Sequence, residues 1–331
     1  MKPEIREFVE KNQKFLQLIE IEKERTIADI GKIMEVSAPT VYSILQEGRK
    51  KGVIKKEKGR TFVPCFGNFA GIYVKDNSIK IGIFDQRFNE IRFEEKHING
   101  DFKRTKLKEI IQYTKNKYSF TYAALVIDGP VENGNVIVIG DDEININGSP
   151  DFFGNEYLIC VNSTILNAIY IRQWITNANN FMYYSIKNRQ FAVVENGKLK
   201  ERMNDRYYGI LPHFKDNNEI MKKLSKFEGD RYDNYYQEIK EKLFHDISRD
   251  IYSMVCMLRP EIVYLDSQII KPKFIKKNFY IDIDEFCFNE IYGKYNMYIK
   301  PVTFVDINDR ELLKAAAKYA EYKFFNWNLI W

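Results

Sequence analysis

The stretch EVSAPTVYSILQEGRKKGV, from Glu35 to Val53, decides how the N-terminal part of the chain folds. Ser37 is a good N-cap, and Pro39 falls in the first helical turn, where an N–H would have no intrahelical partner. Three apolar residues then recur at the spacing of a helix with one thin buried face: Val41, Ile44 and Leu45. The stretch therefore predicts a helix that starts cleanly after Ser37 and runs into cations.

The other face of this predicted helix carries short or flexible polar side chains, where a solvated helix usually carries Glu and Lys: Thr40, Tyr42, Ser43 and Gln46. Groups of this kind can hydrogen-bond the base edges of DNA in the major groove. The cations Arg49, Lys50 and Lys51 follow directly. Cations neutralise phosphates without reading the base sequence, so the pattern is typical of a recognition helix with its phosphate contacts.

The neighbouring segments predict the rest of a small domain. Apolar residues from Pro3 to Ile19 recur at helical spacing, and Thr26 can cap a second, short helix. The inner face of that short helix is made of Ile27, Ile30, Ile33 and Met34. After the cations, VIKK and TFVP read as two short strands joined by the turn EKGR. Residues 1–66 are therefore predicted to form a winged helix-turn-helix domain.

The positive charge of the chain is concentrated in this domain. Seven cations and two acids lie between Val36 and Arg60, a net formal charge of +5, which equals the formal charge of the whole 331-residue chain. Double-stranded DNA is the partner that such a domain predicts. The residues predicted to contact it are Ser37, Pro39, Thr40, Tyr42, Ser43, Gln46, Arg49, Lys50, Lys51, Lys56, Lys58 and Arg60. Another interpretation stays open, in which the domain docks a protein and the lysines only complement the helix dipole.

The composition predicts a folded protein of two or three domains, because 45% hydrophobic and 15% aromatic residues can form more than one core. The four cysteines are Cys65, Cys160, Cys256 and Cys287. Their wide scatter favours buried thiols in a reducing compartment over disulfides or a structural zinc site. The N-terminus lacks a continuous apolar core, and no later run approaches the roughly 20 apolar residues of a membrane-spanning helix. We therefore expect a cytoplasmic protein with no membrane partner.

Behind the winged domain, strands and helices alternate as in an α/β protein. Three short runs from Gly71 to Ile98 predict an antiparallel meander, and a helix is predicted from Thr105 to Tyr118. A similar strand-turn-strand opening recurs near residue 182 and suggests two related lobes. We expect the lobes to span residues 67–162 and 163–331, with dimerisation through the second lobe and a ligand site in the cleft between them.

The order of motifs in the chain resembles the ROK family of bacterial repressors, open reading frames and sugar kinases. In the winged domain the resemblance rests on IADIGKIMEVSAPTVYSIL and on KGRT, where Gly59 and Arg60 fall on the family's Gly-Arg wing pair. In the body it rests on ALVIDGPVENGNVI, VNSTILNA, VVENGKL and LLKAAAKYA. The resemblance covers essentially the whole chain and implies the family's actin-like ATPase fold, which is ribonuclease H-like. It adds Gly59 to the predicted DNA contacts, and we expect Arg60 to enter a narrow A·T-rich minor groove.

Departures from the family pattern predict that the kinase chemistry is lost. The resemblance places Asn162 and Ser163 on the kinases' Asn-Asp pair, whose Asp deprotonates the sugar, and a serine hydroxyl is no base for this step. IYVKDNS and KNRQF replace the two glycine-rich turns that approach the phosphates of ATP. Only His213 matches a zinc ligand of the family. We therefore expect no enzyme activity, no cofactor and no bound metal.

The cleft residues that could still hold a sugar or sugar phosphate are Gly129, Asn162, Ser163 and His213. The sequence does not decide whether a sugar binds there, because Asn162 can equally well cap the helix that begins at Ser163 and do nothing else. The lobes can also serve dimerisation alone or sense an unrelated ligand.

These features together predict a DNA-binding transcriptional regulator, most simply a repressor, with a catalytically inactive ROK body. A homodimer or a dimer of dimers is expected, because one winged domain contacts few bases. Two other functions stay open. One is a sugar kinase that carries an extra domain, and the other is a scaffold whose winged domain binds a protein.

Overall fold

The computed structural model describes residues 3–21, 26–56, 62–64, 67–75, 78–97, 104–118, 120–128, 131–132, 135–136, 158–186, 190–200, 258–266 and 302–325, with single helical positions at 234, 237, 251, 254 and 255. The chain divides into two compact units. One comprises Met1–Leu125, Pro150–Ile159 and Ala316–Leu329, and the other comprises Val126–Ser149, Cys160–Ala315 and Ile330–Trp331.

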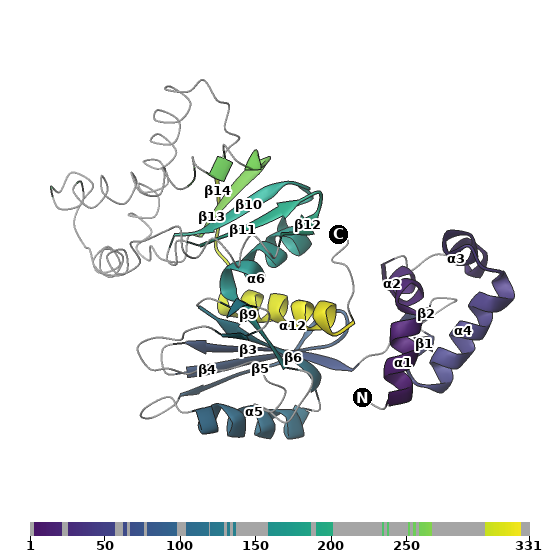
Figure 1. The fold of residues 1–331 in the computed structure, drawn as a ribbon. Coiled ribbons are helices and arrows are strands. Elements are labelled where there is room, and N and C mark those ends of the chain that lie inside the picture. Colours follow the sequence, from purple (N-terminus) through teal and green to yellow (C-terminus); the bar gives the residue numbers. More distant parts are fainter. Residues whose placement is uncertain are drawn as a thin grey trace. The chain divides into compact units, whose positions relative to one another are not determined.

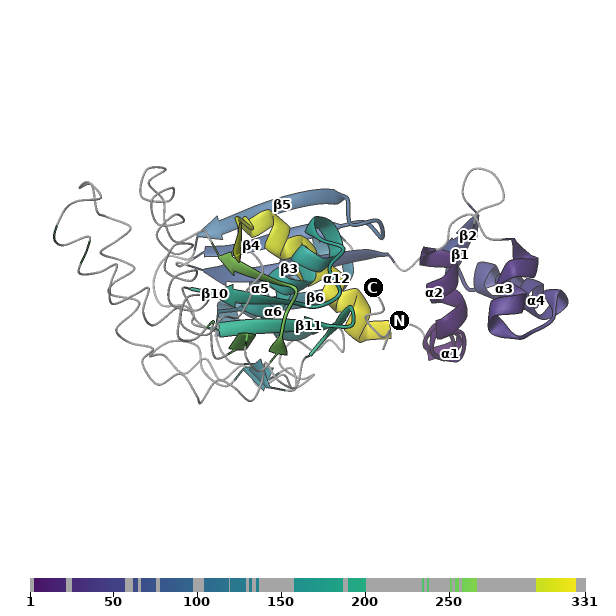
Figure 2. The same ribbon diagram turned by 90° about the horizontal axis from the view of Figure 1, so that it is seen from above.

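The first described segments, up to Pro64, form helices and one small hairpin (Figure 1). The helices are α1 (Pro3–Lys11), α2 (Gln13–Ile21), α3 (Ile27–Met34) and α4 (Ala38–Lys50). The strands are β1 (Ile54–Lys56) and β2 (Phe62–Pro64). They pair antiparallel, and Figure 2 shows β2 beside α2. The predicted helix-turn-helix and its following hairpin are confirmed.

The single helix predicted from Pro3 to Ile19 is wrong, because the segment forms two helices that meet at Asn12. The Asn12 side chain is buried and its Nδ2 donates a hydrogen bond to the backbone oxygen of Phe8, at 2.9 Å. The backbone N–H of Asn12 donates to the same oxygen at 3.1 Å, and the N–H of Leu16 donates to the oxygen of Asn12 at 3.0 Å, so helical hydrogen bonds pass through the junction between α1 and α2.

The turn between α3 and α4 is tight. Thr26 caps α3 as predicted and forms a capping box with Asp29. At the other end of α3, Glu35 adopts a left-handed conformation with φ of 58°, and the N–H of Val36 donates to the backbone oxygen of Gly31 at 2.9 Å. A Cβ at Gly31 would lie 2.9 Å from the oxygen of Val36, so a side chain there would push the turn apart.

The next part of the chain forms a five-stranded sheet of order β5-β4-β3-β6-β9. Its strands are β3 (Asn68–Lys75), β4 (Ser78–Phe84), β5 (Glu90–His97), β6 (Phe120–Ile127) and β9 (Leu158–Asn162). The short strands β7 (Val131–Glu132) and β8 (Asn135–Val136) pair separately. Helix α5 (Arg104–Tyr118) covers one face (Figure 1). The antiparallel pairing of β3, β4 and β5 confirms the predicted meander.

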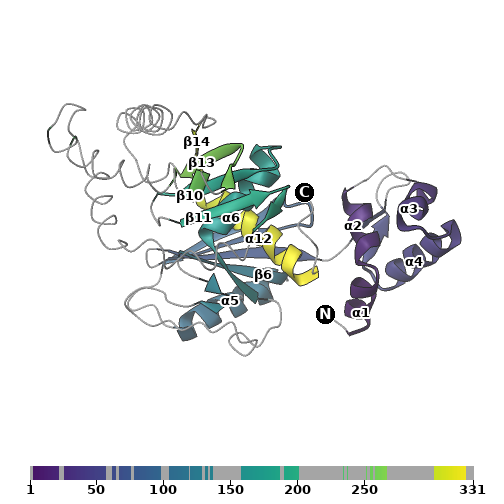
Figure 3. The same ribbon diagram turned by 45° about the horizontal axis from the view of Figure 1, so that its top comes forward.

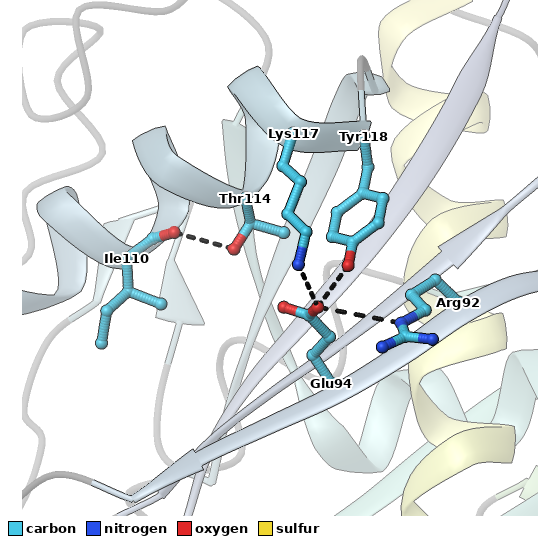
Figure 4. Close-up of polar contacts among 6 residues, drawn as sticks. All are labelled: Arg92, Glu94, Ile110, Thr114, Lys117 and Tyr118. Atoms are coloured by element: carbon cyan, nitrogen blue, oxygen red, sulfur yellow. Dashed lines mark hydrogen bonds and ion pairs between the residues drawn. The ribbon is translucent and has the colours of Figure 1, made fainter.

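The carboxylate of Glu94 anchors α5 on β5 (Figure 4). The Glu94 side chain is 13% exposed, and its Oε1 accepts hydrogen bonds from the hydroxyl of Tyr118 and from Nζ of Lys117, the latter at 3.2 Å. The Nε of Arg92 lies 3.8 Å from the same oxygen. Burial alone would raise the pKa of Glu94, but the hydrogen bonds and the nearby cations outweigh burial and lower that pKa.

The second sheet has the order β12-β11-β10-β13-β14. Its strands are β10 (Phe181–Ser185), β11 (Gln190–Glu195), β12 (Lys198–Leu199), β13 (Ile262–Asp266) and β14 (Val302–Val305). Both sheets have a central hairpin, with the next strand on one side and two later strands on the other. This repeated order confirms the hypothesis of two related lobes.

Helices pack on this second sheet and complete its core. Helix α6 (Ser163–Tyr170) packs against β10 and β11 (Figure 3) and continues into the π-helical turn η2 (Ile171–Ile175). The core beneath it includes Ala168, Ile171, Phe181, Tyr264 and Val305.

The last helix, α12 (Asp309–Phe325), carries the predicted small-residue face. Ala315, Ala316 and Ala317 are fully buried. From Ala316 onward α12 belongs to the unit of the first sheet, and Nζ of Lys318 lies 4.8 Å from the ring centroid of Phe88 there. No helix among the described residues is long and apolar enough to cross a membrane.

Candidate nucleic-acid interface

Helix α4 begins where the sequence predicts. The hydroxyl of Ser37 accepts a hydrogen bond from the N–H of Thr40 at 3.3 Å, and the two side-chain hydroxyls lie 2.8 Å apart. Val41 and Leu45 are buried, and Ile44 is half-buried. The helix is therefore fixed by one face, and the predicted polar residues lie on its remaining surface.

The exposed surface of α4 carries an ordered polar pair. Tyr42 is 55% exposed, and Nε2 of Gln46 donates a hydrogen bond to its hydroxyl oxygen at 2.8 Å. Thr40 and Ser43 are exposed beside this pair. The structure thus places all four predicted base-reading residues on α4, outside its buried face.

The cations at the end of α4 differ from one another. Arg49 and Lys50 are exposed. Lys51 is half-buried, because its Nζ donates to the backbone oxygen of Glu4 on α1 at 3.4 Å and lies 3.7 Å from Oε1 of Glu47. The sequence groups these three cations in one cluster, but of the three only Arg49 and Lys50 are exposed to solvent.

Gly48 is a residue whose role the sequence analysis missed. It lies inside α4, which continues to Lys50. A Cβ at Gly48 would lie 2.4 Å from Cδ1 of Ile54 and 3.0 Å from Cζ of Phe8. The absent side chain lets β1 and α1 approach the buried side of α4. A glycine inside an otherwise helical pattern is the sequence signal that points to such close packing.

The wing contributes further cations. Lys55 and Lys56 are exposed on β1. The remaining predicted contacts of the wing, Lys58, Gly59 and Arg60, lie outside the described residues.

The second candidate site surrounds the N-terminus of α6. Oδ1 of Asn162 accepts a hydrogen bond from the N–H of Thr164 at 2.7 Å, which confirms that Asn162 caps this helix. Its Nδ2 donates to Oε1 of Gln190 at 2.9 Å, and the hydroxyl of Thr164 donates to the same oxygen at 2.9 Å. All three side chains are buried. The Asn162 amide therefore already has partners within the protein at both ends.

Gln190 was missed as part of this network, because the sequence shows it only as part of a turn that lacks glycines. Ser163, which the resemblance places on the catalytic Asp, is 5% exposed at the first position of α6. The other two predicted ligand residues, Gly129 and His213, lie outside the described residues, so the expectations about zinc and a sugar ligand stay predictions.

The effect of two carboxylates on the buried Tyr183 was also missed. The hydroxyl of Tyr183 accepts a hydrogen bond from Nδ2 of Asn167 at 2.8 Å. Burial raises the pKa of Tyr183, and the carboxylates of Asp266 and Asp128 raise that pKa further. Asp266 ends β13 and Asp128 follows β6, so residues distant in the sequence act on one buried tyrosine.

Cys160 matches the expectation of a buried thiol. It is buried on β9, and burial raises the pKa of its thiol to about 12. The other three cysteines lie outside the described residues.

The arrangement of these elements matches solved structures over nearly the whole chain. A ROK family transcriptional regulator, described as a homologue of the E. coli MLC protein, superposes with a TM-score of 0.73 at 12% identity, covering 98% of each chain. The chain has the ROK fold. That match includes the winged helix-turn-helix domain as well as the two sheets, which confirms the predicted α/β architecture.

ROK sugar kinases share the fold over a smaller part of the chain. The ROK hexokinase from Thermus thermophilus has a TM-score of 0.59 at 13% identity, and the Streptomyces griseus ROK glucokinase, solved with glucose and AMPPNP, has 0.54 at 10% identity. Each covers 77% of this chain and 99% of its own. No protein-family model matches the sequence, and no curated protein matches it significantly.

Proposed function

We propose that this protein is a DNA-binding transcriptional regulator of the ROK type, most simply a repressor. One observation carries the proposal: α4 is capped and buried along one face, and its remaining surface holds polar side chains followed by the exposed cations Arg49 and Lys50. A helix of this kind fits the major groove, where the polar groups read bases and the cations contact phosphates.

In this proposal residues 1–66 form the DNA-binding domain, and residues 67–162 and 163–331 form the two lobes of the body. The protein acts as a homodimer or a dimer of dimers through the second lobe, so that two recognition helices reach half-sites separated by whole turns of DNA. The likeness to a solved ROK regulator along 98% of the chain supports this organisation.

We propose further that the body is not a kinase. Ser163 is a buried hydroxyl at the position expected for the catalytic Asp, and Gln190 occupies the second predicted phosphate turn with its amide bonded to Asn162 and Thr164. A sugar or sugar phosphate remains the proposed effector. Such an effector changes DNA affinity only if it binds two states of the protein differently.

The test is fluorescence anisotropy of the full-length protein on a labelled duplex from upstream of its own gene, against a scrambled duplex and a pool of genomic fragments. We expect one specific sequence to bind best, with affinity that falls steeply between about 50 and 200 mM salt. Lys50→Ala should weaken binding. The matched control is Lys14→Ala, which removes an exposed charge from α2.

Other outcomes separate the alternatives. Weak binding to every duplex, unchanged by Lys50→Ala, would favour a protein-binding scaffold. Phosphorylation of a hexose by the purified protein would favour a kinase with an added domain.

A further inference from the structure

The hydrogen bond between Gln46 and Tyr42 sets what the recognition helix offers to DNA. The two residues lie one helical turn apart on α4, Tyr42 exposed and Gln46 half-buried, and Nε2 of Gln46 donates to Oη of Tyr42 at 2.8 Å. A glutamine amide can turn over and exchange its oxygen and nitrogen. In the structure the nitrogen side faces Tyr42 and donates to its oxygen. The turned-over amide would instead accept from the Tyr42 hydroxyl and present two N–H donors, which match guanine, so the selected base reports which orientation meets DNA.

The remaining groups of the oriented amide form a donor and acceptor pair. With one N–H committed to Tyr42, Gln46 keeps Oε1 as an acceptor and its second N–H as a donor. In the major groove, adenine presents the complementary pair, the N6 amino donor and the N7 acceptor. Guanine presents two acceptors, whereas cytosine presents a donor alone and thymine an acceptor beside a methyl group. Adenine is therefore the base that satisfies both free groups of Gln46.

We propose that Gln46 reads an adenine in each half-site through the major groove and that Tyr42 is the positioning residue for its amide. The proposal rests on the DNA-binding function proposed above. It assigns different roles to two residues that the sequence treats alike. Gln46 touches the base, whereas Tyr42 acts through Gln46.

The burial of α4 supports this division. The helix is fixed by Val41 and Leu45, while Tyr42 projects from it with 55% of its surface exposed. The Tyr42–Gln46 bond therefore orders two side chains before DNA arrives. Ordering beforehand reduces the conformational entropy that is lost when the base contact forms.

The experiment selects binding sites from a randomised duplex library with full-length protein, followed by affinity measurements on single-base variants of the selected site. The proteins are wild type, Gln46→Ala, Tyr42→Phe, the double variant, and Lys14→Ala as a control, because Lys14 is exposed on α2 and is not a predicted DNA contact. We expect wild type to select adenine at one position of each half-site. Gln46→Ala should lower the preference at that position by on the order of tenfold and leave the other positions unchanged.

Tyr42→Phe keeps the ring but removes the hydroxyl, so it should lose part of the same preference, about threefold or more, at the same position. In the Gln46→Ala background, Tyr42→Phe should have no further effect on base preference, because Tyr42 acts only through Gln46. A tyrosine that only stabilises the helix would have the same effect in both backgrounds. Lys14→Ala should leave the adenine preference intact.

The outcomes distinguish this inference from the function on which it rests. If wild type selects a site but Gln46→Ala keeps its base preferences, or Tyr42→Phe changes nothing, the inference is wrong and the regulator proposal stands. If wild type selects no sequence, both proposals are overturned.

Discussion

Single residues decide how closely the elements of the winged domain pack, and Gly48 is the clearest case. Alanine is the better helix former by about 1 kcal/mol, so helix propensity alone predicts that Gly48→Ala stabilises the domain. The added Cβ would lie 2.4 and 2.8 Å from the Cδ1 and Cγ1 atoms of Ile54, whose side chain is buried. Overpacking of a core costs about 1–3 kcal/mol, so the cost of the clash should exceed the gain in helix propensity.

We therefore expect Gly48→Ala to destabilise the winged domain by about 1 kcal/mol net. Hydrogen exchange of peptides from residues 1–64 in the full-length protein measures this. Ile54→Ala removes the atoms nearest to the new Cβ, so adding Gly48→Ala to that variant should cost much less or become stabilising. An equal loss in both backgrounds would show that the clash is not the cause.

Glu94 illustrates how a single residue makes stability depend on pH. Because its pKa is lowered in the folded protein, ionised Glu94 stabilises the fold above the ordinary carboxyl range, and this contribution is lost as pH falls through the lowered pKa. Glu94→Gln should cost about 1 kcal/mol at pH 7, the size of a hydrogen bond to a charged group after solvent screening. The difference from wild type should shrink as pH falls below the ordinary carboxyl range and through the lowered pKa of Glu94, because the wild-type side chain then becomes protonated.

Urea unfolding of both proteins at pH 7 and in acid tests this prediction. Glu95→Gln is the matched control, because Glu95 lies on the same strand and pairs with Lys80 at 3.6 Å but is more exposed. Its effect should be smaller. A stability loss for Glu94→Gln that is the same at both pH values would contradict the role given to the carboxylate.

At the scale of elements, α4 combines the proposed DNA contact with attachment to α1. The exposed Lys50 is free to approach a phosphate, whereas Nζ of Lys51 bonds the backbone of Glu4 and neighbours Glu47. Lys50→Ala should weaken binding to all duplexes alike and reduce the salt slope by about 1. Lys51→Ala should change the slope less and loosen α1 instead. Anisotropy over a salt series, with hydrogen exchange of α1, separates the two, and equal slope changes would contradict the assignment.

At the scale of the whole molecule, the two sheets repeat the strand order of the fold that ROK kinases share. The residue at the position expected for the catalytic Asp is the buried Ser163. Purified protein with ATP and a panel of hexoses should give no sugar phosphate, as measured by mass spectrometry, while it still binds DNA. If a sugar phosphate does form, Asp128→Asn becomes the decisive variant, because Asp128 is an exposed carboxylate that acts on Tyr183 and was not foreseen. Formation of a sugar phosphate would itself contradict the proposal of an inactive body, and loss of that activity in Asp128→Asn would show that it belongs to this protein and not to a contaminant.

Much of the fold follows from local sequence patterns. The caps at Thr26 and Ser37, the apolar spacing of α4 and the alternation of strands and helices all depend on residues close together in the chain. Even the duplication of the body can be inferred from its recurring strand-turn-strand openings. The polar surface of α4 is predictable for the same reason, because helical geometry alone places these side chains away from the buried face.

The amino-acid sequence by itself determined the helix-turn-helix with its hairpin, the alternation of strands and helices behind it and the polar residues on α4, since these depend on periodicity and capping. The tertiary structure alone decided which cations of α4 and its end are exposed, because Nζ of Lys51 donates to the backbone oxygen of Glu4, which is distant in the sequence. It likewise decided why Gly48 must lack a side chain, and that Gln190 joins Asn162 and Thr164. These contacts join residues far apart in the chain, and no local pattern encodes distances that only packing creates.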